Sequence, residues 1–250
     1  MGAGSNAEWI RWGEVDPFWG VASWEGKDAE SDQAWSEEEF FEFGRRDWAD
    51  FHDRWARYGL AHGSCLEIGS GTGRMTRAMA ADFAHVHGVD VAPGMLAHAA
   101  RAVANLPVTL HQGDGLTLPL PDGSVDAAFS THVFQHLDST DDANANWREI
   151  FRVLKPGGTF MVHLPVHYWP GGMERLQSLY EMRRRIGDMR AAMRRRKMDK
   201  GGTPIMRGQF YEWNTLDATL TEMGFRDVEL TIIRVSSNNG QHSCVMGRKA

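Results

Sequence analysis

The sequence has few cysteines and no long hydrophobic run, and both features narrow the class of protein. Only two cysteines, Cys65 and Cys244, occur in 250 residues, which excludes a disulfide framework and favours two small buried side chains. No stretch of about 18 apolar residues occurs, and the first thirty residues are acidic and rich in tryptophan rather than basic and then apolar. We therefore expect a soluble, cytoplasmic protein with no membrane partner.

Two common nucleotide-binding motifs are also missing. The phosphate loop G-x-x-x-x-G-K-[ST] is absent, and the dinucleotide motif G-x-G-x-x-G would need a third glycine where Arg74 stands. What is present is the run from Glu67 to Gly73, E-x-G-x-G-x-G, between an apolar segment and a helical one. A strand that turns on glycines into a helix predicts a pocket for a nucleoside cofactor. The acidic Glu67 indicates that the ligand carries positive charge.

This run resembles motif I of the class I S-adenosylmethionine-dependent methyltransferases, and the resemblance continues in order over roughly residues 60–165. The predicted strand at 85–90 ends in Asp90, and the predicted strand at 108–112 is followed by Gly113 and Asp114. The resemblance implies that Asp90 binds the ribose hydroxyls and that Asp114 receives the adenine amino group. It implies S-adenosylmethionine as cofactor and a binding set of Glu67, Gly69, Ser70, Gly71, Gly73, Asp90, Val91, Met95, Asp114, Gly115, Leu116 and Thr131.

The length and the 42% hydrophobic content suit one α/β domain with a modest insertion. We expect a Rossmann-like class I methyltransferase sheet of seven strands, the last antiparallel, with an N-terminal helical lid and a helical cap after the fifth strand. Residues 1–60 would form an arm and a lid helix, irregular over 1–33 and helical from about 35. Residues 61–250 would form the methyltransferase domain, with the cap insertion at about 168–210.

The predicted cap is strongly basic, although the whole chain has a formal net charge of −6. Residues 175–200 hold ten Lys and Arg against three Asp and Glu, a local charge of +7. A solvated helix face, a site for an anionic acceptor and an RNA-docking surface are the three interpretations. No aromatic residue stands between Arg183 and Lys200 to stack on bases, which argues against nucleic acid as a partner.

Four histidines follow two predicted neighbouring strands and are the candidates for a general base. His132 and His136 follow the fourth strand, and His163 and His167 follow the fifth. A base must remove a proton if the methyl acceptor is a hydroxyl, and the ordinary pKa of histidine suits that task. His136 is the first choice, because similar small-molecule O-methyltransferases place a catalytic histidine after the fourth strand.

The same histidines are spaced as H-x-x-x-H, which on a helix would place two metal ligands on one face. A strand-to-loop exit is not a continuous helix, so we predict no metal. Magnesium on Asp138, Asp141 or Asp142 is an alternative, but these residues favour capping the helix that follows.

Tryptophans outside the motifs, including Trp9, Trp12, Trp19 and Trp24, offer flat faces suited to sugars or ring systems, or else pack within the lid. With the histidines, they favour O-methylation of a small-molecule acceptor, either a sugar or a natural-product scaffold, carbohydrate or anionic in character. The alternatives are N-methylation of a small amine, modification of RNA or protein docked through the arginine-rich insertion, and a binding module without turnover.

Overall fold

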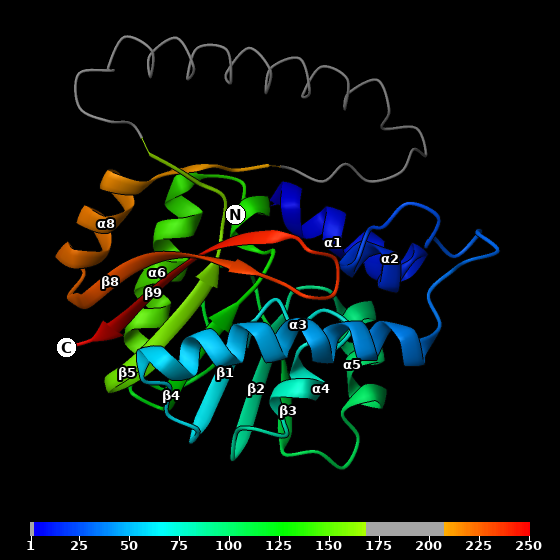
Figure 1. Cartoon of the computed structure of the whole chain (residues 1–250), viewed down its shortest axis with the longest axis horizontal. Helices are drawn as coiled ribbons and strands as arrows, with labels where there is room; N and C mark the ends of the chain where they lie inside the picture. The colour runs from blue at the N-terminus through cyan, green and yellow to red at the C-terminus, as the bar shows by residue number, and fades with distance from the viewer. Residues whose placement is uncertain (1–2, 169–207) are drawn as a thin grey trace, which may run out of the picture.

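The computed structural model describes residues 3–168 and 208–250, and a seven-stranded sheet stands at its centre (Figure 1). The strands are β1 (Ser64–Ile68), β2 (His85–Asp90), β3 (Val108–Gln112), β4 (Val125–Ser130), β5 (Leu154–His163), β8 (Phe225–Arg234) and β9 (Gln241–Lys249). Their order is β3-β2-β1-β4-β5-β9-β8, and only β9 runs antiparallel to its neighbours. The prediction of seven strands with the last one antiparallel is confirmed.

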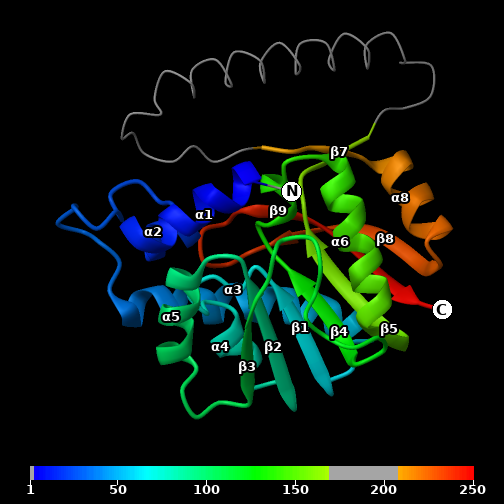
Figure 2. The same cartoon turned by 180° about the vertical axis from the view of Figure 1, so that it is seen from behind.

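Helices cover both faces of this sheet (Figures 1 and 2). Trp48 of α3 packs with Met79 of α4 and with Phe129 on one face, and Trp147 of α6 packs with Leu220 of α8 on the other. The helical elements are α1 (Ala3–Val15), α2 (Pro17–Val21), α3 (Glu37–Tyr58), α4 (Thr76–Met79), α5 (Pro93–Ala102), the 3-10 turn η1 (Phe134–His136), α6 (Thr140–Val153) and α8 (Trp213–Glu222). No helix among the described residues is long and apolar enough to cross a membrane.

Helix α3 is well specified by local sequence. Ser36 caps its first turn by accepting a hydrogen bond from the N–H of Glu39 at 3.2 Å, and Gly59 ends it in the left-handed conformation. Its buried Trp55 donates to Thr159 Oγ1 of β5 at 3.1 Å. We expected this helix to lie over the cofactor, but it packs on the face of the sheet.

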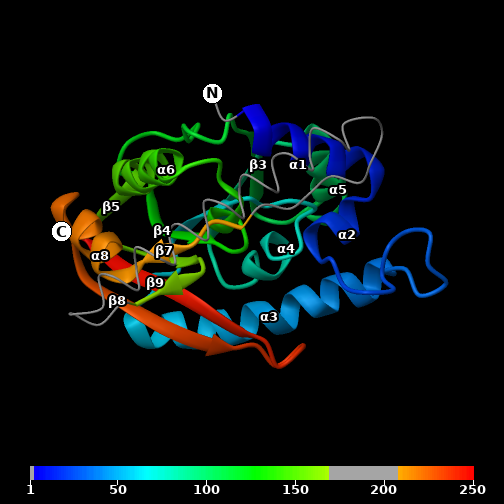
Figure 3. The same cartoon turned by 90° about the horizontal axis from the view of Figure 1, so that it is seen from above.

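The segment before α3 differs from the prediction of an irregular arm, because it contains α1 and α2. Asp16 caps α2 by accepting from the N–H of Trp19 at 3.1 Å. Helix α1 has little amphipathic periodicity and is held by tertiary contact instead: a Cβ on Gly94 of α5 would lie 2.5 Å from the carbonyl oxygen of Gly13. Figure 3 shows α1 and α2 running beside α5 rather than along the sheet face that α3 covers.

Most of the predicted cap, including the basic run, lies outside the described residues. Where the chain is described again, it contacts the turn after β4. The N–H of Gln209 donates to the carbonyl oxygen of Gln135 at 2.6 Å, and the hydroxyl of Tyr211 donates to that of Phe134 at 2.6 Å. Two short strands, β6 (Val166–His167) and β7 (Tyr211–Glu212), pair in parallel next to the turn after β4.

Both cysteines match their prediction as small buried side chains. Cys65 of β1 and Cys244 of β9 are free thiols with no solvent-exposed surface, and burial raises the pKa of each. They contribute to the core between α3 and the sheet.

Candidate cofactor site

The glycine turn after β1 takes a shape that only glycine accommodates. Gly69 and Gly71 have φ values of +77° and +53°, in the left-handed region. A Cβ on Gly69 would lie 2.1 Å from Cγ2 of Val133, and one on Gly71 would lie 2.9 Å from Cγ2 of Val21. The N–H of Gly69 donates to the carbonyl oxygen of Val89 at 2.8 Å, which fixes the turn to β2.

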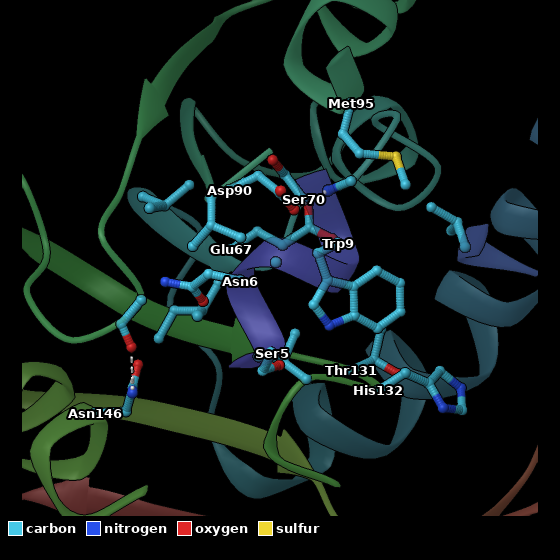
Figure 4. A pocket seen from close by; sticks show the side chains of 18 of the residues that line it. Ser5, Asn6, Trp9, Glu67, Ser70, Asp90, Met95, Thr131, His132 and Asn146 are labelled. Carbon is cyan, nitrogen blue, oxygen red and sulfur yellow. Dashed lines mark hydrogen bonds between the residues drawn. The ribbon is translucent and has the colours of Figure 1, made fainter. Parts of the chain in front are cut away.

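A cavity lies between this turn, the ends of β2 and β4, and helix α1 (Figure 4). The predicted cofactor-binding residues that line it are Glu67, Gly69, Ser70, Gly71, Asp90, Val91, Met95, Gly115 and Thr131. Gly73, Asp114 and Leu116 of the predicted set do not line it. The hydroxyl oxygens of Ser70 and Thr131 are buried without a hydrogen-bond partner in the described part of the chain, so both are available to a ligand.

Asp90 joins the glycine turn to the start of α5. One carboxylate oxygen accepts from the N–H of Gly71 at 2.8 Å and the other from the N–H of Ala92 at 2.9 Å. Burial raises the pKa of Asp90, and these backbone donors oppose that rise. The carboxylate is therefore fixed at the cavity wall, where the resemblance placed the ribose hydroxyls.

Glu67 is almost fully buried, with 2% of its surface exposed. Thr76 Oγ1 donates to its carboxylate at 2.5 Å. Burial raises the pKa of Glu67 to about 7, despite that hydrogen bond and the nearby Arg74. A ligand with positive charge beside Glu67 would stabilise the ionised form, as the sequence suggested.

Asp114 is turned away from the cavity. One oxygen accepts from the N–H groups of Leu116 and Thr117 at 2.8 and 2.7 Å, and the other accepts from Thr117 Oγ1 at 2.7 Å. Its carboxylate thus closes a local turn, and Gly115 and Thr117 are the residues of this turn that line the cavity. Asn146 Nδ2 of α6 donates a hydrogen bond to the carbonyl oxygen of Gly115 at 2.9 Å.

Three lining residues come from α1: Ser5 and Asn6, which were not predicted, and Trp9, which was considered as an acceptor contact or as part of the lid packing. Ser5 Oγ donates to the carbonyl oxygen of His136 at 2.7 Å, and Asn6 Nδ2 donates to that of Asp114 at 2.8 Å. Figure 4 shows the three side chains coming from one helix toward the residues of the sheet edge. Their partners stand more than a hundred residues away in the sequence, so no local pattern could have indicated them.

The four candidate histidines do not all gather at the cavity. His132 lines it, and the ring of His163 lies beside His132 with centroids 4.4 Å apart. His136 does not line it, but its ring contacts that of Trp9 at a centroid distance of 5.3 Å. His167 lies apart from them on β6, opposite Glu212 of β7.

The amide of Gln135 lies between two of these imidazoles, 2.9 Å from Nε2 of His136 and 3.4 Å from Nδ1 of His132. Burial lowers the pKa of His132 well below its usual range and lowers that of His163 to about 3. Both rings are therefore neutral at physiological pH.

The aspartates considered as magnesium ligands were predicted to cap the helix that follows, but Ser139 is the cap. Ser139 caps α6 by accepting from the N–H of Asp142 at 3.1 Å, and Asp141 and Asp142 lie in the first turn. Asp138 accepts from the N–H of Ser5 at 3.2 Å. The segment from Asp138 to Asp142 therefore begins α6 and binds the start of α1.

Comparison with known proteins gives relatives that are methyltransferases. The family described as a methyltransferase domain matches residues 66–162. The uncharacterized methyltransferase YdaC of Bacillus subtilis is 33% identical over 137 residues, which cover 54% of this chain and 73% of YdaC. A demethylmenaquinone methyltransferase of Symbiobacterium thermophilum is 37% identical over 103 residues, covering 38% of this chain and 40% of that protein.

Solved structures agree at the level of the fold. A methyltransferase of Leishmania major that depends on S-adenosylmethionine superposes with a TM-score of 0.62 at 15% identity, over 98% of this chain and 83% of that one. The chain spans only 30% and 40% of the length of two curated relatives that it matches. From the match to YdaC and the order of its seven strands, the chain belongs to the class I methyltransferases, whose cofactor is S-adenosylmethionine.

Proposed function

We propose that this protein transfers the methyl group of S-adenosylmethionine to a hydroxyl group of a small molecule, a sugar or a natural-product scaffold. One observation carries this proposal: a single cavity is lined by the carboxylates of Glu67 and Asp90 and by His132, beside which further imidazoles stand. Carboxylates suit the cationic, ribose-bearing cofactor, and imidazoles suit the proton of a hydroxyl acceptor.

The cavity fits the cofactor in its chemistry. The glycine turn brings backbone close to the ligand space, and Ser70 and Thr131 offer hydroxyls with no other partner among the described residues. When bound, S-adenosylmethionine supplies a methyl group on a positively charged sulfur. The chain then has to align the acceptor with that methyl group, exclude water and take up the proton of the acceptor hydroxyl.

We assign the general base to His136. Burial lowers the pKa values of His132 and His163, which makes those rings weaker bases. His136 is oriented by the Gln135 amide on one side and contacts the ring of Trp9 on the other. Because Trp9 lines the cavity, a small rotation of its indole would let an acceptor hydroxyl approach His136.

Trp9 also supports an acceptor with a ring. Trp12 and Trp19 pack on each other at 4.9 Å, and Trp24 packs on Trp35 at 5.5 Å, so these indoles serve the lid itself. Among the described residues, Trp9 is the tryptophan that lines the cavity, and a flat indole face suits a sugar or a planar scaffold. The relative named demethylmenaquinone methyltransferase also supports a ring-bearing acceptor.

The test is turnover of the variant His136→Ala with a panel of hydroxylated sugars, phenols, small amines and RNA. We expect kcat to fall by about 10²- to 10⁴-fold, the usual contribution of a general base, while calorimetry finds the affinity for S-adenosylmethionine unchanged. His85→Ala is the matched control, since His85 bonds Thr109 on the far strands at 3.0 Å.

Unchanged turnover in His136→Ala would remove that residue from the role. Methylation of amines alone would support the N-methyltransferase alternative. Methylation of RNA or protein alone, with binding that weakens steeply with salt, would support docking through the basic segment.

A further inference from the structure

Three histidines from three strand ends meet beside the cofactor cavity. His132 follows β4, His163 ends β5 and His242 lies near the start of β9. Their ring centroids lie 4.4, 4.8 and 5.1 Å apart, and each ring offers a nitrogen within 4.8 Å of those of the other two. His242 was not among the predicted site residues.

The pairing of β5 with β9 brings two of these rings together. His163 stands opposite Cys244, so the alternation of side chains places His242 on the same face as His163. His132 completes the cluster from a left-handed backbone conformation with φ of +60°, which is uncommon for a residue other than glycine. Strain of this kind is typical of residues whose side-chain direction matters to a site.

We propose that His132, His163 and His242 form a binding site for a divalent transition-metal ion, specifically Zn²⁺, with one coordination position open toward the cofactor cavity. Three imidazoles with a fourth position left for water or substrate are a known catalytic zinc set. Imidazole nitrogens suit zinc and its neighbours, whereas magnesium and calcium prefer oxygen ligands. Since His132 lines the cavity, a ligand on that open position would reach the acceptor space.

The three imidazole rings are neutral, and two of them have nitrogen atoms that are free, or nearly free, to coordinate a metal. Burial is the main cause that lowers the pKa of all three, so they are neutral. His242 Nδ1 is buried and has no hydrogen-bond partner within residues 3–168 and 208–250. His163 Nδ1 accepts only a long bond of 3.3 Å from the N–H of His132, which a metal ion could replace.

The geometry and the surrounding charge both allow an ion. Zinc–nitrogen bonds of 2.0–2.1 Å in a tetrahedron place the nitrogens about 3.4 Å apart, so the rings must close by at most about 1.4 Å. Among the described residues, Arg74 is the cation whose charge acts on His132 and His242, and its guanidinium is paired with the buried carboxylate of Asp47 at 2.7 Å. Because the two opposite charges cancel, this pair adds little net charge beside the site, and Ser237 also donates a hydrogen bond to the Asp47 carboxylate.

The role of the ion rests on the proposed O-methylation. On the open position, the ion would bind the acceptor oxygen and lower the pKa of its hydroxyl, as it does for bound water. The O–H proton passes to His136, and the oxygen forms a bond to the methyl carbon. The carbon–sulfur bond breaks with its electron pair left on sulfur, which releases a neutral thioether.

The test measures metal binding without activity. The full chain is stripped with a chelator and titrated with Zn²⁺, and separately with Co²⁺, whose visible absorption reports tetrahedral nitrogen coordination. We expect one equivalent per chain in the unmodified protein and at least about 100-fold weaker binding in His163→Ala and His242→Ala, since even outer partners cost 10- to 100-fold. His242→Gln, nearly isosteric, gives the same answer if the alanine variants unfold.

His62→Ala is the control, because His62 and His52 form a surface pair with their Nε2 atoms 2.9 Å apart. Absence of tetrahedral Co²⁺ absorption, or equal metal loss in His62→Ala and the cluster variants, would overturn the site. Tight zinc binding without any O-methylation would leave the site standing and defeat the proposed function instead. Turnover of hydroxyl acceptors by a chain that binds no zinc would support the proposed function and overturn the metal site.

Discussion

Glu67 has a buried carboxyl group that lowers stability, and we propose that the same group binds the cofactor. Its carboxyl is buried at the end of β1 with one hydroxyl donor, Thr76 Oγ1, and burial raises its pKa from 4.5 to about 7. The folded chain therefore holds this proton more tightly than the unfolded chain does. The site keeps an acidic group there at the expense of stability, which is common where a charged ligand binds.

The sign of the pH dependence follows from that shift. Below pH 4.5 the carboxyl is protonated in both states, and as pH rises through 7 the folded protein loses on the order of 3 kcal/mol relative to that reference. We expect Glu67→Gln, which keeps an acceptor for Thr76, to gain free energy of unfolding over the unmodified protein progressively between pH 5 and 8. Urea unfolding across this range measures it.

The exposed Glu222→Gln on α8 is the matched control, and it should leave the pH profile unchanged. Glu67→Gln should at the same time weaken binding of S-adenosylmethionine, since it removes the carboxylate that we propose lies beside the positive charge of the cofactor. A profile for Glu67→Gln parallel to that of the unmodified chain would contradict the raised pKa.

At the scale of elements, α1 decides how closed the cofactor cavity is. The helix is attached by Ser5 and Asn6 to the segments after β4 and β3, and it contributes Trp9 to the cavity wall. Its apolar contacts form a small cluster, Trp12, Ala92 and Met95, separate from the two clusters that flank the sheet. Because this cluster is separate from the main core, we expect α1 to open without unfolding the domain.

We expect Trp9→Ala to release S-adenosylmethionine about tenfold faster, which corresponds to about 1.4 kcal/mol, a usual scale for an aromatic contact. The melting temperature without ligand should change little, because Trp9 belongs to the small cluster. Stopped-flow displacement of bound cofactor measures the rate. Val15→Ala, at a position 60% exposed on the same helix, is the control. Equal release rates in both variants would show that α1 does not retain the cofactor.

At the scale of the whole molecule, the cavity draws its walls from segments spread between Ser5 and Asn146. A ligand that contacts both the sheet edge and α1 binds only the folded chain, so binding adds directly to stability. At one hundred times its Kd, S-adenosylmethionine should contribute about 2.7 kcal/mol. For a domain of this size, that raises Tm by about 5–10 °C.

Thermal unfolding with and without the cofactor checks this shift. Asp90→Asn should reduce the shift at the same concentration, since a carboxylate that accepts from the N–H groups of Gly71 and Ala92 is replaced by an amide. The absence of any shift at millimolar cofactor in the unmodified protein would contradict cofactor binding altogether.

The sequence by itself determined the sheet and the acidic ends of its first two strands. Glu67 and Asp90 could be placed because the sequence around them resembles the class I methyltransferases, and the carboxyl ends of parallel strands meet at one edge. The glycine turn was equally readable, since Gly69 and Gly71 take a backbone shape that other residues rarely adopt.

Only the tertiary structure decided the position of α1 and the meeting of His242 with His163. Each depends on groups far apart in the chain: Asn6 reaches Asp114 across 108 residues, and His242 joins His163 only through the register of β5 with β9. The periodicity of apolar residues in the sequence indicates which face of an element is apolar, but it does not indicate which distant segment covers that face. The lid and the histidine cluster are therefore properties of the folded molecule.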